Sequence, residues 1–425
     1  MITKDSFINY FRSGIKETND CGIGIEHEKF VFLDNKRADY QSILNLFEKL
    51  YEFGWEPVKE GTNIIALKKG NKNITLEPGN QIELSGEKLK SIHQTCGESQ
   101  EYIFELNQSL KKLNLNLISS GFDPISKIEK VPSNPKNRYD LMTKIMPLFG
   151  KLSLDMMYRT CGTQVNIDYT SEKDFSKKFF VVNRLVPITI ALFANSGIVE
   201  KNKSGYLSYR SYAWQNTYRG GLPKIFLENM DFEKYADFSL NYPMLFLKRN
   251  DNYIDAKNKT FQNFIDGDIE KASPNEEDVA DHLSTIFTEN RLKKYIEIRS
   301  MDACGWDCLC AGPAFFIGLL YGKLDEVFDV VKRWNIDEII SAYKESPKKG
   351  LKTILGKKSI LDWSKDLFEI SKQGLVNRNE LNSKKQNEVK FLDHIKTIID
   401  TNSTNAEAIM AQYQKDKNFF NINEK

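Results

Sequence analysis

The sequence predicts a large, ordered protein of mixed helices and strands, in which several strands carry polar residues on one shared face. Three observations support this expectation. The chain has 425 residues, 40% of them are hydrophobic and 28% charged, and strand-like segments alternate polar and apolar residues. A chain of this length exceeds the usual single domain, so we expect two domains or one unusually large α/β unit. The composition, with only 12 prolines, excludes a disordered or collagen-like chain.

Helical periodicity and strand-like alternation divide the chain into successive elements. Helices are expected over residues 3–13, 40–53, 87–113, 172–193 and most of 313–370, and strands over 22–33, 64–68, 74–84, 160–169 and 294–300. Residues 195–223 are rich in Gly, Ser, Tyr and Arg and are too long for an ordinary connection, so we expect a functional loop there. From about residue 377 the composition turns polar, which indicates peripheral helices with a frayed end.

The charge balance gives no sign of a nucleic-acid partner. Lys and Arg number 60 against 58 Asp and Glu, which leaves a formal net charge of +2. The longest apolar runs, around 185–194 and 311–321, are shorter than the ~20 residues that span a bilayer, so no membrane partner is expected. The N-terminal residues have the layout of neither a secretory signal nor a transit peptide. We therefore expect a cytoplasmic protein.

Four segments place polar residues on one strand face, because side chains two residues apart on a strand point the same way. The shared polar faces hold Glu26 and Glu28; Gln81, Glu83 and Ser85; Thr160, Gln164, Asn166 and Asp168; and Glu297 and Arg299, with Glu77 just before a Pro-Gly turn. A half-buried antiparallel sheet with a solvated face shows the same alternation, so one such strand indicates little by itself.

Together the four faces have an unusual composition, because they carry carboxylates and carboxamides and no lysine. Five acids on one face repel one another unless cations lie between them. These acids are Glu26, Glu28, Glu77, Glu83 and Glu297. Oxygen ligands without Cys or His select Mg²⁺ or Mn²⁺ over zinc. We therefore expect a concave site for divalent metal ions, formed by these carboxylates and called here the metal cup.

Such a metal usually accompanies a phosphate, yet the ordinary phosphate loops are missing. The glycines at 22 and 24 are followed by His27 where a third glycine would stand, and residues 350–358 miss the Walker spacing. Phosphates would then be held by metals and by arginines, whose guanidinium forks match phosphate or carboxylate. The arginines near the polar strands or in the long loop are Arg159, Arg210, Arg219 and Arg299. An ordinary surface role stays open for each.

A series of motifs in unbroken order carries a family resemblance. They include GIEHEKFVF, LEPGNQIELSG, LDMMYRTCGTQVNID, GYLSYRSYAW and TIFTENRLKKYIEIRS. From about residue 24 to 321 the chain resembles the plant-type glutamate-cysteine ligases of plants and many bacteria. The resemblance implies an α+β fold with a curved antiparallel β-sheet of glutamine-synthetase type, whose polar active-site face is backed and flanked by α-helices. It also implies Mg²⁺-dependent ligation of L-glutamate to L-cysteine with ATP, the first step of glutathione synthesis.

Carried over by motif, the resemblance assigns roles to residues. It implies Glu26, Glu28, Glu77, Glu83 and Glu297 as metal-binding carboxylates, with Gln164 and Asn166 as further metal or substrate contacts. It implies Arg299, Arg210 and Arg219 as catalytic binders of phosphate and glutamate, with Lys29 beside the nucleotide, and Arg159, Thr160, Tyr212 and Trp214 at the substrates. The glutamate γ-carboxylate would attack the γ-phosphoryl group of ATP, and the cysteine amine would capture the acyl phosphate.

The expected organisation is a catalytic domain over 1–345, with an active-site loop region at 195–223, and a C-terminal helical extension over 346–425 packed on the same unit. A monomer or a homodimer is expected. Two alternatives share this architecture: a ligase that joins glutamate to another amine, and a phosphagen-kinase-like phosphotransferase. A catalytically inactive regulator that binds Mg²⁺ and nucleotide is a third, but no strand carboxylate is missing.

Six cysteines are too few for a disulfide framework. Cys304, Cys308 and Cys310 lie close in sequence, where a metal clip is one interpretation and buried thiols are the expected one. The resemblance also matches Cys96 and Cys310 with a cysteine pair of the plant enzymes. In a reducing compartment we expect these two as thiols rather than as a bond.

Overall fold

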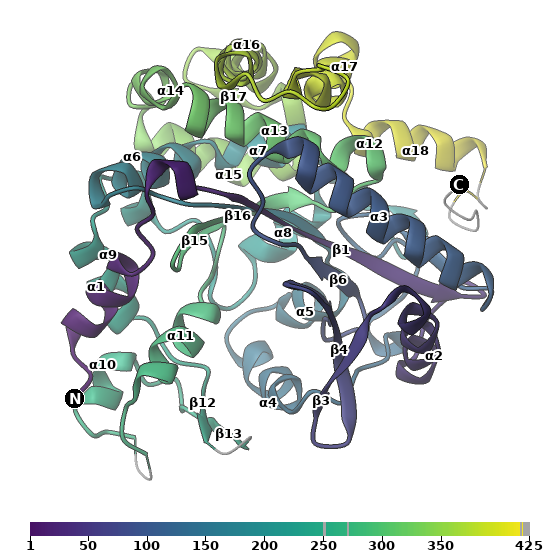
Figure 1. The fold of residues 1–425 in the computed structure, drawn as a ribbon, viewed down its shortest axis with the longest axis vertical. Coiled ribbons are helices and arrows are strands. Elements are labelled where there is room, and N and C mark those ends of the chain that lie inside the picture. The colour runs from purple at the N-terminus through teal and green to yellow at the C-terminus, as the bar shows by residue number, and fades with distance from the viewer. Residues whose placement is uncertain (250–251, 270–271, 417–418, 420–425) are drawn as a thin grey trace.

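A large antiparallel sheet runs through the middle of the molecule (Figure 1). The computed structural model describes residues 1–249, 252–269, 272–416 and 419. Along the sheet the strand order is β15-β16-β8-β1-β6-β5-β4-β3, with β2 and β7 also paired to β1. Its strands are β1 (Ile23–Leu33), β2 (Lys36–Arg37), β3 (Glu56–Glu60), β4 (Asn63–Lys69), β5 (Lys72–Leu76), β6 (Ile82–Ser85), β7 (Asn116–Ile118), β8 (Gly162–Ile167), β15 (Asn290–Leu292) and β16 (Ile296–Asp302). Every pair in it is antiparallel.

Helices surround this sheet, and the remaining strands form short pairs outside it: β9–β10, β12–β13 and β17–β18 are antiparallel, and β11–β14 is parallel. The helices are α1 (Lys4–Arg12), α2 (Tyr40–Leu50), α3 (Ile92–Lys111), α4 (Asn137–Ile145), α5 (Ser153–Arg159), α6 (Glu172–Arg184), α7 (Val186–Leu192), α8 (Tyr209–Gln215), α9 (Phe232–Leu240), α10 (Phe261–Ile265), α11 (Glu276–Ser284), α12 (Trp306–Leu309), α13 (Ala311–Ile317), α14 (Leu324–Val331), α15 (Ile336–Lys349), α16 (Ile360–Arg378), α17 (Asp393–Thr401) and α18 (Asn405–Lys415). The short strands are β9 (Ile198–Val199), β10 (Asn202–Lys203), β11 (Gly220–Gly221), β12 (Phe246–Arg249), β13 (Asn252–Asp255), β14 (Phe287–Thr288), β17 (Ile354–Leu355) and β18 (Lys358–Ser359).

The main core lies behind the apolar sides of β1, β8 and β16. Ile23, Val165 and Ile298 are almost fully buried there and belong to one cluster with the apolar residues of α6, α7 and α13. Burying this apolar surface is the main force that holds the helices on the sheet. It also fixes the opposite faces of the same strands, because a strand that buries one set of alternating side chains turns the other set away.

The expected α+β architecture, with an antiparallel sheet and covering helices, is confirmed, and several element boundaries are corrected. The strand expected over 74–84 is two strands, β5 and β6, separated by the turn that contains Pro78 and Gly79. The segment 195–223 is more ordered than a loop, because it contains α8 and the β9–β10 hairpin. Within the described residues no single helix is long and apolar enough to cross a bilayer, although the bent pair 306–322 and 324–331 reaches that length and composition together.

The cysteines differ from the expectation of free thiols. Cys96 of α3 is bonded to Cys310 at the start of α13, and Cys304 is bonded to Cys308. The first bond forms because α3 lies against the α12–α13 segment, which brings the two Cα atoms to 6.0 Å. The expected thiols at these four positions, and the alternative of a metal clip, are therefore wrong for this structure.

Candidate active site

The register of four antiparallel strands brings the predicted polar residues together on one face. The cross-strand pairs are Glu26 with Ser85 and with Gln164, Glu28 with Glu83, and Asn166 with Glu297. Each pair joins side chains from neighbouring strands that the alternation assigned to the polar face. The shared polar face predicted from the sequence is therefore confirmed for β1, β6, β8 and β16.

Glu26, Glu28 and Glu83 form a crowded group of carboxylates, the carboxylate triplet. Burial of the carboxyl group and then the charge of Glu77 raise the pKa of Glu28 to about 7. Burial, followed by the charges of Glu26 and Glu77, raises the pKa of Glu83 well above its usual range. Burial and then Glu297 raise the pKa of Glu26. Each carboxylate is thus destabilised in its charged form, and a cation between them would relieve that cost.

The hydrogen bonds to these carboxylates are few. The Gly162 N–H donates to Glu28 over 2.6 Å, and the Asn166 amide donates to Glu26 over 2.7 Å. The Thr75 and Ser85 hydroxyls donate to one oxygen of Glu83 over 3.1 and 3.0 Å. Within the part of the chain that the structure describes, no lysine or arginine side chain pairs with the triplet; the nearby cations pair with Glu297 instead.

A divalent cation fits these donors chemically. The triplet offers hard oxygen ligands, and the Asn166 Oδ1 atom is buried without a hydrogen-bond partner in the described part of the chain. Among the described residues, no three Asp, Glu, His or Cys side chains already converge as a metal site. The fit therefore rests on the donor chemistry and the destabilised charges, and the metal cup stays a prediction.

Glu297 has a different environment from the triplet. Its carboxylate pairs with Arg291, with Lys293 over 2.7 Å and with Arg299 over 3.8 Å. Burial would raise its pKa, but these three cations outweigh burial and hold the pKa below its usual range. Arg291 was not predicted as a site residue. The register of the β15–β16 hairpin could have identified it, because Arg291 on β15 lies directly opposite Glu297 on β16.

Arg299, Arg210 and Trp214 form the basic side of the site. Arg299 donates to the Gln164 Oε1 atom over 2.7 Å, and Arg210 donates to the backbone oxygen of Arg299 over 2.9 Å. Both guanidinium groups lie over the Trp214 ring, at 5.5 and 5.3 Å from its centroid. The Nε atoms of both arginines are buried and have no hydrogen-bond partner among the described residues. These unused donors are available to an anionic ligand.

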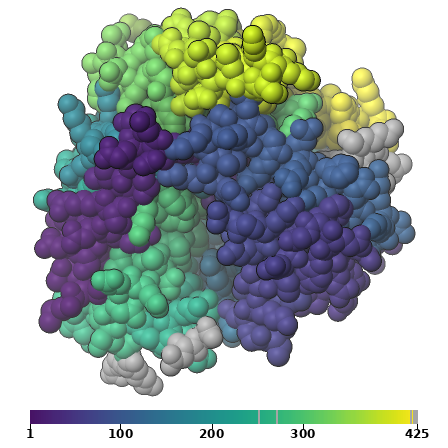
Figure 2. Space-filling view, in the orientation of Figure 1, coloured from purple at the N-terminus to yellow at the C-terminus, as the bar shows by residue number. Residues whose placement is uncertain are grey.

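A small cavity of about 70 Å³ connects the acidic and basic sides. Glu28, Glu77, Arg138 and Arg299 contribute its charged lining, and Thr160 and Gln81 also reach it. Its apolar lining comes from Met142, Met156, Met157, Trp214 and Phe287. Figure 2 shows that the molecule is hollowed near the centre of one face, between the purple and blue N-terminal strands and the green elements that include α11. An enclosure with charged and apolar sides can hold a charged substrate away from water.

Arg138 is the principal residue that the sequence analysis missed. It lies on α4, and its Nε atom is buried without a partner within the described chain. No alternating pattern or motif in the sequence of α4 indicated a site residue, because its side chains reach the cavity only through tertiary packing against the sheet. The neighbouring Tyr139 donates to the backbone oxygen of Leu76 over 3.1 Å, which fixes α4 beside β5.

Ten predicted site residues are not part of the lining of this cavity. Six of them lie on the polar sheet face or, for Arg210, contact Arg299: Glu26, Glu83, Gln164, Asn166, Glu297 and Arg210. The other four lie away from both the polar face and the cavity. Lys29 points to the opposite side of β1, where it donates to Ser119, because it is an odd number of residues from Glu26 and Glu28. Arg219 donates to Thr285 O over 2.9 Å and to Thr285 Oγ1 over 3.2 Å. Arg159 and Tyr212 are the other two. Lys29 therefore lies on the face of β1 opposite Glu26 and Glu28, and its expected role beside the nucleotide stays a prediction.

Arg159 and Tyr212 have partners of their own. Arg159 pairs with Asp155 over 2.8 Å and with Glu200 over 3.2 Å. Tyr212 stacks on Tyr206 with ring centroids 4.3 Å apart. Both residues lie on α5 or α8, next to helix neighbours that do line the cavity. The structure thus brings Thr160 and Trp214 to the site and leaves Arg159, Tyr212 and Arg219 outside its lining.

Comparisons with known proteins agree over almost the whole chain. Residues 22–421 match the model of glutamate-cysteine ligase family 2. The chain is 38% identical to the chloroplastic glutamate–cysteine ligase A of Oryza sativa subsp. indica, covering 97% of this chain and 85% of that one. The chloroplastic enzymes of Brassica juncea and Arabidopsis thaliana are 39% and 38% identical, covering 97% of this chain and 81% and 80% of theirs. A solved complex of the ubiquitin-like protein Pup with its ligase PafA aligns at a TM-score of 0.42 and 11% identity, covering 95% of this chain and 70% of that one.

These relatives correct one expectation. They are chloroplastic enzymes, whereas the sequence led us to expect a cytoplasmic protein. The cytoplasmic expectation rested on the charge, the short apolar runs and the N-terminal residues, none of which reports on a compartment directly. It is contradicted and is withdrawn.

Proposed function

Because the chain belongs to glutamate-cysteine ligase family 2, we propose that the carboxylate triplet and the cavity beside it are the place where it carries out the ligase reaction. The chain is an ATP-dependent glutamate–cysteine ligase. It joins the γ-carboxylate of L-glutamate to the amine of L-cysteine, and the product is γ-glutamylcysteine. The observation that carries the placement is that Glu28, Glu77, Arg138 and Arg299 line one cavity.

The metal would be held by the carboxylates. Glu26, Glu28 and Glu83 are its proposed ligands, with Glu77, Gln164, Asn166 and Glu297 as further oxygen donors nearby. Mg²⁺ suits these donors, and Mn²⁺ is the alternative. When bound, such an ion neutralises phosphate charge.

The arginines position and neutralise the anionic groups. Arg299 and Arg210 present buried Nε–H groups beside the acidic face, and Arg138 presents another from α4; none of the three has a hydrogen-bond partner among the described residues. These donors suit the phosphates of ATP and the carboxylates of glutamate, because a guanidinium fork bonds both in planar geometry. We assign Arg219 only a supporting role, since its side chain is engaged with Thr285.

The apolar lining of the cavity suits a reaction that passes through an intermediate sensitive to water. The glutamate γ-carboxylate oxygen attacks the γ-phosphorus of ATP, and ADP leaves. The cysteine amine then attacks the acyl carbon of γ-glutamyl phosphate, and phosphate leaves. Water would hydrolyse that intermediate, so Met142, Met156 and Phe287 would protect it by excluding solvent. In these two reaction steps, no side chain of the protein forms a covalent bond with a substrate.

A coupled ADP-release assay, with glutamate fixed and the amine varied, tests this function. We expect steady ADP release with cysteine and a product with the mass of γ-glutamylcysteine. A faster reaction with another amine would identify a different acceptor. Steady ADP release without any amine would instead indicate a phosphotransferase or an ATPase.

The organisation of the chain is also a proposal. Residues 1–345 would form the catalytic unit and 346–425 an extension packed on it. This is supported by one shared core, in which Leu367 and Leu375 of α16 belong to the same cluster as Phe315 of α13. We propose a monomer or a homodimer, which sedimentation analysis distinguishes.

A further inference from the structure

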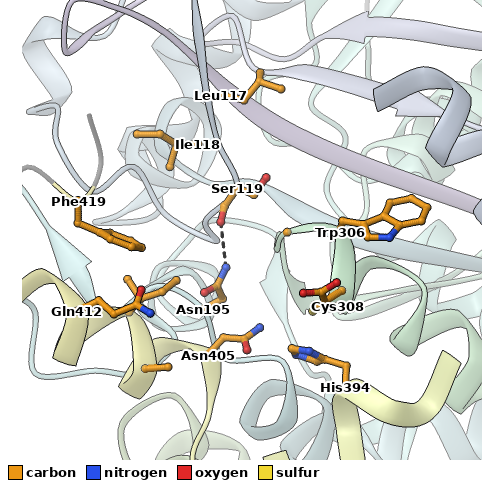
Figure 3. A pocket seen from close by; sticks show the side chains of 14 residues that line it. Leu117, Ile118, Ser119, Asn195, Trp306, Cys308, His394, Asn405, Gln412 and Phe419 are labelled. Atoms are coloured by element: carbon orange, nitrogen blue, oxygen red, sulfur yellow. Dashed lines mark hydrogen bonds between the residues drawn. The ribbon is translucent and has the colours of Figure 1, made fainter. Parts of the chain in front are cut away.

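A second cavity lies on the side of β1 to which Lys29 points, away from Glu26 and Glu28. Its volume is about 390 Å³. It is enclosed by β7 and the residue after it, by α12, and by the C-terminal helices α17 and α18 (Figure 3). Leu117, Ile118 and Trp306 give it an apolar side. Its polar side comes from Ser119, Asn195, Asp307, His394, Asn405 and Gln412. A volume in this range accommodates a small molecule. We call it the rear cavity.

Two polar atoms beside the rear cavity lack hydrogen-bond partners among the described residues. Asn195 is 2% exposed, and its amide nitrogen donates to Ser119 O over 3.1 Å and to Ala303 O over 2.7 Å. Its Oδ1 atom is buried and has no partner in the residues that the structure describes, and the same holds for the His394 Nε2 atom. Buried polar atoms are rarely left unpaired in native proteins. A ligand that offers an N–H group to Asn195 Oδ1 and a hydrogen-bonding group to His394 Nε2 would satisfy both, and an ammonium group would also suit the carboxylate of Asp307.

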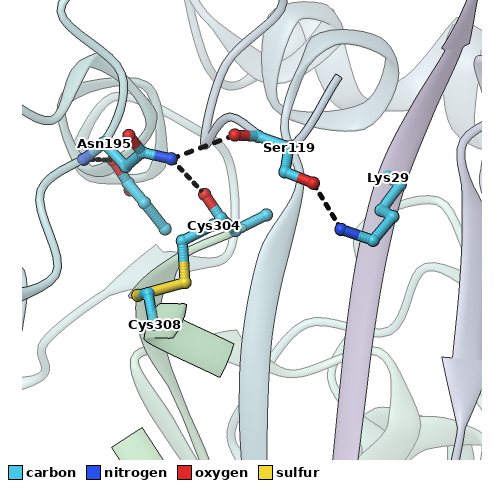
Figure 4. The surroundings of a disulfide bond; sticks show 7 residues. Lys29, Ser119, Asn195, Cys304 and Cys308 are labelled. Carbon is cyan, nitrogen blue, oxygen red and sulfur yellow. Dashed lines mark hydrogen bonds between the residues drawn. A yellow bond between two sulfur atoms is a disulfide. The ribbon is translucent and has the colours of Figure 1, made fainter. Parts of the chain in front are cut away.

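A disulfide forms part of the same wall. Cys308 lines the rear cavity and is bonded to Cys304, which does not line it (Figure 4). A disulfide reacts with an incoming thiolate at whichever sulfur the thiolate reaches, and the other sulfur leaves. The cavity therefore presents Cys308 as the sulfur that a bound thiol would attack.

We propose that the rear cavity binds a small peptide thiol, which exchanges with the Cys304–Cys308 disulfide. The thiolate of the ligand attacks Cys308 Sγ, and a bond between the ligand sulfur and Cys308 forms. The Cys304–Cys308 bond breaks, and its electron pair leaves on Cys304 Sγ as a thiolate, which takes a proton from solvent. One disulfide replaces another, so the step needs no oxidant or reductant.

The chemistry of the lining indicates the kind of thiol. The Asn195 Oδ1 atom accepts from an ammonium or amide group, while His394, Asn405 and Gln412 offer nitrogen donors to a carboxylate. A γ-glutamyl thiol carries all of these groups. Choosing that class rests on the proposed function, because the ligase reaction produces such a compound. The site itself goes beyond the ligase activity and lies outside the catalytic cavity.

The test is exchange with γ-glutamylcysteine, followed by alkylation of free thiols, digestion and mass spectrometry. We expect the ligand on Cys308 and an alkylated Cys304, with a rate that saturates as γ-glutamylcysteine increases. 2-Mercaptoethanol, which lacks the polar groups, should give a rate that rises linearly. A linear rate with both thiols would overturn the proposal, because saturation is the mark of binding before exchange.

A matched pair of substitutions on α18 locates the site. Ala408 lines the rear cavity and Ala411 does not, and both are exposed on the same helix. Ala408→Trp should fill the cavity and slow exchange by about tenfold or more, equivalent to roughly 1.4 kcal/mol or more, while Ala411→Trp should match the parent protein. Equal rates in all three proteins, or equal labelling of Cys96 and Cys308, would contradict the proposal.

The ligase-site variant Glu83→Gln separates this proposal from the proposed function. Exchange at Cys308 should continue at the parent rate in Glu83→Gln, whatever its ligase activity. Loss of exchange in this variant would place the thiol in the catalytic cavity and overturn the rear site. Failure of the parent protein to make γ-glutamylcysteine would instead contradict the proposed function and leave the exchange result standing.

Discussion

Glu28 of β1 lies directly opposite Glu83 of β6 in the antiparallel register of the sheet. Burial and then the charges of Glu26, Glu77 and Glu28 raise the pKa of Glu83, and burial and then the charge of Glu77 raise the pKa of Glu28. Like charges facing each other across two strands destabilise a sheet unless a ligand lies between them. The facing position of these two carboxylates is therefore explained if a cation binds between them.

Metal affinity should depend on pH through Glu28. Its pKa is raised to about 7, so the carboxyl group holds a proton below that pH and must lose it to bind a cation. One such group predicts binding of Mg²⁺ roughly tenfold tighter at pH 8 than at pH 6, which titration calorimetry measures. Glu28→Gln should reduce this pH dependence, and the part that remains belongs to Glu26 and Glu83, whose pKa values are also raised. An unchanged affinity across that range in the parent protein would contradict the assignment.

Stability without metal should fall as pH rises. A raised pKa in the folded state means that the protonated form is favoured by folding, so the contribution of Glu28 is present at low pH and is lost as pH increases through about 7. The melting temperature of the metal-free protein should therefore decrease between pH 6 and pH 8. Added Mg²⁺ should oppose that decrease, and a melting temperature that rises with pH would refute this explanation.

Glu83→Gln should reduce activity strongly while leaving the fold intact. The neutral amide removes a metal ligand, and we expect kcat to fall about 100-fold or more, equivalent to roughly 2.7 kcal/mol or more of barrier. The same change removes a buried like charge, so the metal-free melting temperature should not fall. Glu56→Gln, at an exposed position of the edge strand β3, is the matched control. Near-normal turnover of Glu83→Gln at saturating Mg²⁺ would eliminate the cup model.

Arg299→Lys should be severely impaired although it keeps the charge. An ammonium group cannot keep the bond to Gln164, the contact with Trp214 and a bidentate bond to an anion together. Steady-state kinetics should show about a 100-fold loss of kcat/KM, or roughly 2.7 kcal/mol. Arg12→Lys, on the exposed side of α1, should retain full activity. Full activity of Arg299→Lys would show that the reaction does not need the guanidinium group of Arg299, and would contradict its role as an anion-binding residue.

Arg138→Lys tests the residue that only the structure revealed. Arg138 lines the cavity, and its Nε atom has no hydrogen-bond partner in the part of the chain that the structure describes. We therefore expect KM for glutamate or ATP to rise about tenfold or more while the melting temperature stays within a few degrees. The two KM values, measured separately, identify the anion that Arg138 binds. If neither KM changes, Arg138 has only a structural role.

Strand periodicity allowed much of the site to be predicted. Glu26, Glu28 and Glu83 could be placed on one face because a strand repeats every two residues, and the register then confirmed it. The same rule puts Lys29 on the other face of β1, so its expected role beside the nucleotide stays a prediction. The spacing of residues along a strand predicts which face each side chain takes, and it does not by itself predict what the side chain binds.

Contacts that depend on tertiary packing could not be predicted from patterns in the sequence. Arg138 reaches the cavity because α4 packs beside β5, and no periodic pattern in 137–145 points to that contact. Arg291 meets Glu297 only through the hairpin register. The Cys304–Cys308 bond depends on the turn between β16 and α12, which spacing alone left open. These contacts join residues whose relation appears only after the chain has folded.

The most direct test of the central claim follows one oxygen atom. L-Glutamate labelled with ¹⁸O in its γ-carboxylate is turned over with ATP and cysteine, and the released phosphate is analysed by mass spectrometry. If the γ-carboxylate attacks the γ-phosphorus, each phosphate carries one ¹⁸O atom for each γ-glutamylcysteine formed. Unlabelled phosphate released together with γ-glutamylcysteine would contradict the acyl-phosphate mechanism.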